Sequence, residues 1–231
     1  MFSKSKLLIL GIPRSGTTLL TAMVGAHPQV AMLNEDLSNA INNLVSKKVF
    51  GNKLCIPNQV CFETTLLSRL ARRYGFYLYR DRSVISLDEY LQDEDLNVVL
   101  ILRDPRANIS SMIESGNLSF DRATQRWHRG IEIADQLYSQ EEERTLLISF
   151  ERLVQKPERT MMSVSDFLSI EFDPNMLEGW KGTTHSNRGG ILAKKARTGE
   201  KVNLPGDLCK EFPESYKNYE RLSSQCRPTP Q

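Results

Sequence analysis

The chain has 231 residues, of which 40% are hydrophobic, enough for one substantial core without clear room for a second. Its 30 Lys and Arg against 28 Asp and Glu argue against nucleic-acid binding by bulk electrostatics. The first apolar run ends at Pro13 and is too short to span a bilayer. We therefore expect one cytoplasmic domain over residues 1–231, without a nucleic-acid or membrane partner, and nothing in the composition selects an oligomeric state. The cysteines have no nearby histidines, so we expect free buried thiols and no metal at Cys55, Cys61, Cys209 and Cys226.

Strand and helix patterns alternate along the chain. Short continuous apolar runs predict buried strands, and segments with helical spacing lie between them. The strands are predicted at residues 7–10, 30–33, 52–56, 98–102 and 145–148, and the helices at 17–26, 63–74, 104–114, 120–140 and 161–168. This alternation favours a three-layer α/β fold, in which helices flank a central, mainly parallel sheet. Ligands of such folds bind at the carboxyl ends of the strands.

The loop after the first strand has the features of a phosphate-binding loop. Gly11 and Gly16 have the spacing of a P-loop, so the backbone N–H groups of residues 14–18 can converge on one anion at a helix N-terminus. Thr17 stands where an NTP-binding P-loop carries its lysine, and the nearby cation is Arg14. The loop therefore predicts a nucleotide phosphate site that does not hydrolyse ATP.

Two motifs together resemble a known family. Residues 11–20, GIPRSGTTLL, are similar to the 5′-phosphosulfate loop of sulfotransferases that use 3′-phosphoadenosine 5′-phosphosulfate (PAPS). In that family an Arg at a strand end and a Ser eight positions later hold the donor's 3′-phosphate, and Arg103 and Ser111 have this spacing. Phe150 stands where relatives often carry a Tyr. The resemblance covers roughly residues 6–168 and implies a P-loop-like fold, adenosine 3′,5′-bisphosphate (PAP) as the product, and no metal.

The resemblance also implies which residues bind the donor. The 5′-phosphate is assigned to the loop residues Arg14, Ser15, Gly16, Thr17 and Thr18. A further basic segment near the C-terminus reaches the donor in this family, and a Gly-rich basic stretch occupies residues 185–203 here. Its candidates are Lys195 and Arg197, with Lys194 beside them. A solvated basic loop explains the stretch equally well, and residues 227–231 are expected to fray.

A general base is expected near the loop, since sulfuryl transfer requires removal of the acceptor's proton. The chain is predicted to return through strand 30–33 to the carboxyl edge, where Glu35 and Asp36 follow. This region resembles tyrosylprotein sulfotransferases, whose catalytic Glu matches Glu35, so we favour Glu35 over Asp36. His27 is another candidate, although a capping role is favoured for it. A solvated acidic pair is the structural alternative.

A lysine is expected to contact the transferred group. Lys53 occupies a place similar to the family's Lys-Thr-Pro segment, although the Thr is absent and the Pro is displaced to Pro57. Lys47 and Lys48 compete with it but resemble a solvated helix end. Arg14 and Lys53 are therefore predicted to stabilise the transferred group.

These features favour sulfuryl transfer from PAPS to a hydroxyl or amine. We expect a small-molecule acceptor, because the chain is short for the long groove that a protein acceptor needs. A P-loop kinase or NTPase is the alternative in another reaction class, with Asp104 as the Mg²⁺ ligand. A non-catalytic nucleotide-binding protein on the same fold is the third possibility.

Overall fold

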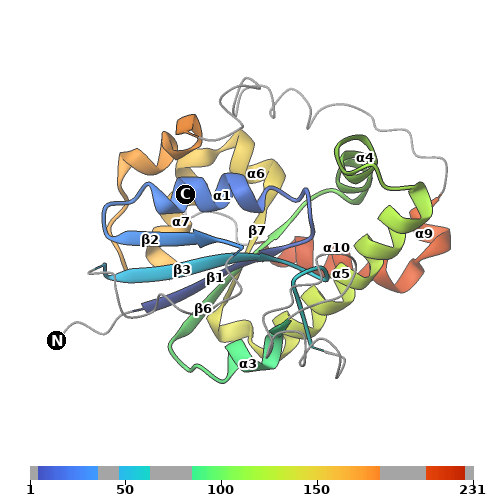
Figure 1. The fold of residues 1–231 in the computed structure, drawn as a ribbon, viewed down its shortest axis with the longest axis horizontal. Coiled ribbons are helices and arrows are strands. Elements are labelled where there is room, and N and C mark those ends of the chain that lie inside the picture. The colour runs from blue at the N-terminus through green and yellow to red at the C-terminus, as the bar shows by residue number, and fades with distance from the viewer. Residues whose placement is uncertain (1–4, 36–46, 63–84, 183–206, 227–231) are drawn as a thin grey trace, which may run out of the picture.

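The fold is built on a five-stranded parallel sheet. A computed structural model describes residues 5–35, 47–62, 85–182 and 207–226 (Figure 1). The strand order is β2-β3-β1-β6-β7, and every neighbouring pair is parallel. The bounds are Ser5–Gly11 for β1, Val30–Asn34 for β2, Val49–Cys55 for β3, Leu96–Leu102 for β6 and Thr145–Ser149 for β7. This confirms the predicted α/β class and brings the carboxyl ends of all five strands to one edge.

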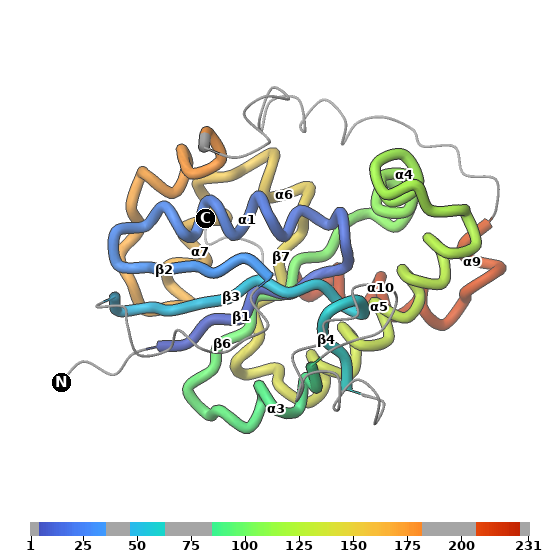
Figure 2. Tube along the Cα trace, viewed as in Figure 1, coloured from blue at the N-terminus to red at the C-terminus, as the bar shows by residue number. Residues whose placement is uncertain are grey.

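Helices cover both faces of this sheet (Figures 1 and 2). One face packs against α1 (Thr17–Gly25), α6 (Phe150–Gln155) and α7 (Pro157–Phe167). The other packs against α4 (Pro105–Gly116), α5 (Phe120–Gln140), α9 (Leu208–Glu211) and α10 (Pro213–Gln225). Buried residues of α5 recur every three or four positions, as an amphipathic helix on a sheet requires. The three predicted layers are therefore present.

Smaller elements complete the described fold. A two-stranded parallel sheet pairs β4 (Val60–Cys61) with β5 (Ile85–Ser86), and α3 (Leu87–Leu91) follows it directly. Single 3₁₀ turns are η1 (Glu142–Arg144), η2 (Pro174–Leu177) and η3 (Gly179–Gly182). The predicted helix at residues 63–74 and the basic stretch at 185–203 lie outside the described residues.

The predicted start of β3 was wrong, and the helix α10 was not predicted. β3 begins at Val49 rather than at residue 52. The earlier start was missed because Gly51, which pairs with β1 on one side and β2 on the other, interrupts the apolar run. A Cβ at Gly51 would come within 2.9 Å of the Leu7 carbonyl oxygen, so this position excludes an apolar side chain and interrupts the strand pattern. The prediction left α10 unassigned. This helix packs against α5, where the ring centroids of Tyr219 and Trp127 are 6.5 Å apart.

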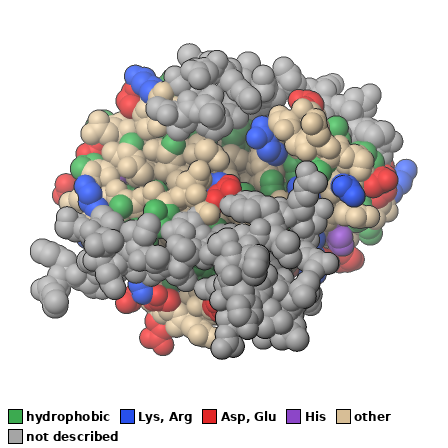
Figure 3. Space-filling model, viewed as in Figure 1, with side chains coloured by type: hydrophobic (Ala, Val, Ile, Leu, Met, Phe, Trp, Pro, Cys, Tyr) green, Lys and Arg blue, Asp and Glu red, His purple; other side chains and the backbone are tan. Residues whose placement is uncertain are grey.

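The described surface matches the composition. Basic and acidic side chains are interspersed over the described atoms of the face in Figure 3 and gather in no large patch of one sign. No helix of the described part is long and apolar enough to cross a membrane. Three cysteines are buried free thiols as expected, whereas Cys209 is exposed on the short α9, whose buried residue is Leu208.

Candidate active site

The loop between β1 and α1 has the backbone shape that a phosphate requires. Gly16 is the N-cap of α1 and has φ +99°, a left-handed conformation that favours glycine. A Cβ at Gly16 would also overlap the Phe150 ring. Arg14 has φ +72°, which is uncommon for a residue with a side chain and occurs at functional sites. The left-handed backbone at Arg14 and Gly16 thus turns the chain from β1 into α1, and within this turn the Ser15 N–H donates to the Ile12 carbonyl at 3.0 Å.

The hydroxyls of this loop fit an anion. Ser15 is buried, and its Oγ has no hydrogen-bond partner among the described residues. A buried hydroxyl without a partner is unfavourable, and a phosphate oxygen would satisfy it. Thr17 is also buried, whereas Thr18 is exposed at the loop surface. The residues present therefore fit a bound phosphate group.

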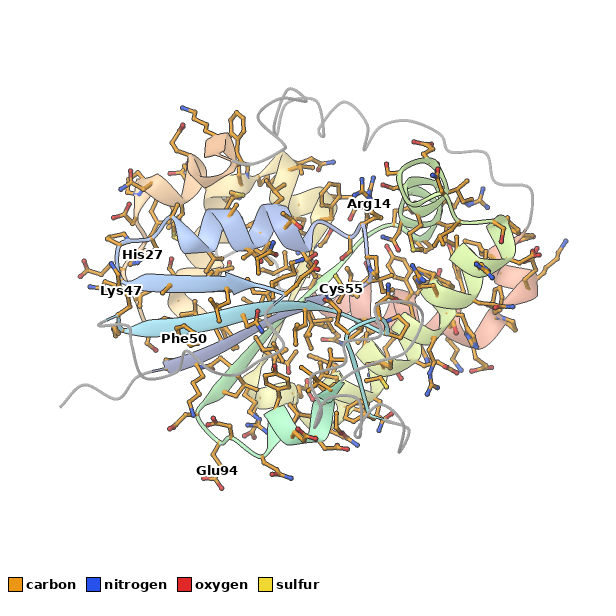
Figure 4. The ribbon with its side chains drawn as sticks, in the orientation of Figure 1. Arg14, His27, Lys47, Phe50, Cys55 and Glu94 are labelled. Carbon is orange, nitrogen blue, oxygen red and sulfur yellow. The ribbon has the colours of Figure 1, made fainter. Side chains whose placement is uncertain are left out.

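The second predicted phosphate motif contacts the first. Arg103, one residue beyond β6, donates from Nη1 to the Arg14 carbonyl oxygen at 2.8 Å. The Arg14 Nε in turn donates to Ser111 Oγ of α4 at 3.3 Å. In Figure 4, Arg14 lies between α1 and α4. The two motifs, about 90 residues apart in the chain, form one basic cluster at the carboxyl edge.

Phe150 packs against two members of this region, Gly16 and Arg103. Its ring packs against Gly16, and the Arg103 guanidinium lies 4.6 Å above the ring centroid. A guanidinium over an aromatic face is held by a cation–π attraction without losing its hydrogen-bond donors. Phe150 therefore links the phosphate loop to the second basic residue, a role that the sequence alone did not assign.

A carboxylate that sequence reasoning missed connects the loops after β6 and β7. Glu151 Oε1 accepts from the Asp104 backbone N–H at 3.0 Å, and its Oε2 accepts from the Ser149 hydroxyl at 2.7 Å. Asp104 itself caps α4 by accepting from the Ala107 N–H at 2.9 Å. In the described part of the chain, no group of three or more His, Cys, Asp or Glu is placed to hold a metal ion.

The predicted base and lysine form an ion pair at the same edge. Glu35 directly follows β2, and its N–H donates to the Lys53 carbonyl at 2.9 Å. The Lys53 Nζ donates to Glu35 Oε1. Lys53 is only 1% exposed, so its ammonium depends on this carboxylate for compensation. Glu35 also has a left-handed backbone, with φ +62°, so it is a second strained residue at this edge after Arg14.

A third side chain, Gln59, completes the carboxylate's environment. It lies in the turn after β3 and donates from Nε2 to Glu35 Oε2 at 2.8 Å. Burial raises the pKa of Glu35, but the hydrogen bond and charge of Lys53 and the hydrogen bond of Gln59 outweigh it, so the pKa lies below its usual value. Sequence reasoning missed Gln59. The available signal was a polar residue just past a predicted strand end.

The other candidates for base and cation lie elsewhere or outside the described residues. Figure 4 shows His27 and Lys47 at the opposite end of the sheet from Arg14 and Cys55. His27 is buried there, accepting from the Gln29 N–H at 3.0 Å and donating to the Glu171 carbonyl at 2.9 Å. Both ring nitrogens are therefore engaged in hydrogen bonds near the amino end of β2. Four of the predicted site residues lie outside the described ranges, and their roles stay predictions: Asp36, Lys194, Lys195 and Arg197.

Lys47 and Lys48 are exposed as expected and precede β3, while the segment before them, residues 36–46, lies outside the described residues. Their ammonium groups donate to the carbonyls of Pro28 and Ser169, each at 2.6 Å. Both lie at the amino end of β3, whereas Lys53 lies near its carboxyl end. The structure thus separates both competitors from the basic cluster.

Comparison with known proteins identifies related sequences. A family model described as the sulfotransferase domain matches residues 4–187. Protein-tyrosine sulfotransferase 2 of Gallus gallus is 28% identical over an alignment of 237 residues, gaps included. This alignment covers 90% of this chain and 62% of that protein. Protein-tyrosine sulfotransferase A of Caenorhabditis elegans is 26% identical over 211 residues, covering 74% and 51%. The chain therefore spans between about half and two thirds of these relatives' lengths.

Solved structures share the fold. The sulfotransferase domain of the Synechococcus PCC 7002 olefin synthase has a TM-score of 0.64 at 16% identity and covers 96% of both chains. A mouse sulfotransferase complexed with PAP has a TM-score of 0.52 at 12% identity, covering 97% of this chain and 85% of that one. At these identities the likeness establishes the fold, and it confirms the predicted P-loop-like architecture.

Proposed function

Because the chain belongs to the sulfotransferase domain family, which uses PAPS as its donor, we propose that it transfers a sulfuryl group from PAPS to the phenolic hydroxyl of a protein tyrosine. The tyrosine acceptor is supported by the relatives, which are protein-tyrosine sulfotransferases. The small-molecule acceptor suggested by chain length has no such support. The kinase alternative loses its basis with the family assignment, and the cytoplasmic location stays a prediction.

One observation carries the proposal: the phosphate loop, the Arg103 and Ser111 pair, and the Glu35 and Lys53 pair all lie at the carboxyl edge of one sheet. When bound, PAPS supplies a sulfuryl group whose S–O bond to the 5′-phosphate breaks, with its electron pair left on the phosphate, as the acceptor oxygen bonds to sulfur. The loop amides and the Ser15 hydroxyl bind the 5′-phosphate.

Charge on the leaving phosphate is met by cations already at the edge. Arg103 and Ser111 bind the 3′-phosphate and so fix the donor's position relative to the loop. Arg14 and the buried ammonium of Lys53 neutralise the negative charge that develops on the phosphate oxygen. The compensation comes from protein groups that are positioned before the reaction.

Glu35 acts as the general base. A tyrosine hydroxyl has an ordinary pKa of about 10, so it attacks efficiently only if its proton is taken as the new bond forms. The lowered pKa of Glu35 keeps this carboxylate ionised near neutral pH. Glu35 accepts the acceptor's proton while the acceptor oxygen bonds to sulfur, which closes the proton balance of the transfer.

The test combines donor binding with turnover. Calorimetric titration without metal should show tighter binding of PAP than of ADP or ATP. Labelled PAPS with tyrosine-containing peptides should give a sulfated product, and Glu35→Gln should keep PAP affinity and lose turnover. Glu143→Gln, an exposed carboxylate beside the amino end of β7, is the matched control. Preference for ATP with Mg²⁺, or full turnover by Glu35→Gln, would refute the assignment.

A further inference from the structure

Gln59 links three parts of the candidate site. Its Oε1 accepts from the Cys55 backbone N–H at 2.7 Å, and its own N–H donates to the Cys55 carbonyl at 2.8 Å. Gln59 is thereby fixed at its backbone and at the Oε1 end of its side-chain amide. Because Oε1 is already engaged, the Nε2 group is the one that faces Glu35, at 2.8 Å from Oε2.

The turn that carries Gln59 is also tied to the phosphate loop. The Ile56 N–H donates to the Gly11 carbonyl at 3.1 Å, and Gly11 is the residue at which β1 ends and the loop begins. Gln59 is half-buried in this turn. A movement of Glu35 relative to the donor site would therefore break a hydrogen bond to a fixed amide.

The two carboxylate oxygens of Glu35 have different partners. Lys53 holds Oε1, and Gln59 holds Oε2. In the proposed reaction, the Lys53 ammonium also acts on the charge that develops on the leaving phosphate, so it serves the donor as well as Glu35. A glutamate side chain that is held at one oxygen alone keeps more rotamer freedom than one held at both. Gln59 is neutral, and its side-chain amide bonds to Glu35 and the Cys55 backbone, so it has no part in neutralising the phosphate.

We propose that Gln59 is a positioning residue for Glu35, holding the carboxylate toward the acceptor hydroxyl while Lys53 acts on the donor. This inference rests on the proposed function. It assigns to Gln59 no contact with either substrate. Within the described part of the chain, the charged and titratable groups acting on this cluster are Lys53 and Cys55 of β3, with Arg126 of α5 acting on Cys55.

The test uses Gln59→Leu, which keeps the approximate volume and removes both amide hydrogen bonds. PAP affinity should stay within about twofold, because no donor contact is lost, whereas kcat should fall roughly tenfold, as expected for one lost hydrogen bond to a charged group. The acid limb of the kcat profile should move to higher pH, by up to roughly one unit, because the ionised carboxylate loses a donor. Gln136→Leu, an exposed glutamine on α5, is the control.

A second variant separates positioning from simple packing. Gln59→Glu keeps the shape but places a carboxylate against Glu35, so the acid limb should move further up than in Gln59→Leu. The inference is overturned if Gln59→Leu keeps wild-type kcat and acid limb, or if kcat and PAP affinity fall together without a shift of the limb. If the wild type sulfates no tyrosine, the proposed function fails and this inference with it. If only the Gln59 variants behave as wild type, the inference alone fails.

Discussion

The Glu35 and Lys53 pair makes an asymmetric stability prediction. The Lys53 side chain is 2% exposed and the Glu35 side chain 38% exposed. Replacing Glu35 with Ala leaves an ammonium buried without its carboxylate. Replacing Lys53 with Met removes the charge and fills the same space with apolar atoms, while Glu35 keeps access to water and its bond to Gln59. Removing Glu35 should therefore lower the free energy of unfolding more than removing Lys53 does.

The magnitude follows from burial. Removing one partner of a buried pair costs about 3–5 kcal/mol, and replacing the buried charge by a well-packed apolar side chain is about neutral or stabilising. We expect Glu35→Ala to lower the free energy of unfolding by about 3 kcal/mol, near the low end because Glu35 is partly solvated. Lys53→Met should change it by less than about 1 kcal/mol. The double variant should regain most of the loss.

Urea unfolding at pH 7 measures all four free energies, with Glu143→Ala as the exposed control expected within about 0.5 kcal/mol. The decisive comparison is the double variant against Glu35→Ala. If Lys53→Met destabilises as much as Glu35→Ala, or if the double variant is the least stable of the series, the buried ammonium is not what Glu35 compensates and the reasoning is wrong.

Three further predictions concern the donor loop, the second basic residue and the thiols. Gly16→Ala should weaken PAP binding by roughly tenfold or more, since a left-handed residue with a Cβ costs about 1–2 kcal/mol and must also displace Phe150; unchanged calorimetric affinity would contradict the loop geometry. Arg103→Ala should weaken PAP much more than 5′-AMP, because only PAP carries a 3′-phosphate, and equal losses would remove this assignment. At pH 8 one thiol per folded chain, Cys209, should react rapidly with an aromatic disulfide reagent; Cys226 should not, since burial raises its pKa to about 12, and a second fast thiol would refute the burial pattern.

Much of this site was predictable because parallel sheets obey simple rules. Continuous apolar runs identified β1, β6 and β7, and parallel strands bring their carboxyl ends to one edge. Arg103 follows β6 directly and Arg14 lies in the loop after β1, so their proximity needed no knowledge of side-chain packing. The P-loop spacing likewise required a helix N-terminus beginning after Gly16, as observed.

The features that the sequence did not reveal depend on contacts between distant segments. Glu151 connects two loops by accepting from Asp104 and Ser149, and nothing in its local sequence marks it. The helix α10 has few apolar residues, so it became assignable only where Leu222 is buried against the core. The Gln59 amide donates to the carboxylate of Glu35, 24 positions earlier in the chain, and only the folded chain brings the two together.

The sequence by itself determined the class of fold, the phosphate loop and the edge at which the chemistry gathers, because these depend on local periodicity and on the chirality of parallel connections. Only the tertiary structure decided that Lys53, rather than Lys47 or Lys48, meets Glu35, and that His27 faces the opposite end of β2. Register sets these pairings: Asn34 lies opposite Lys53, which places the next residue, Glu35, over that lysine. Register is a property of paired strands, and no single strand's sequence contains it.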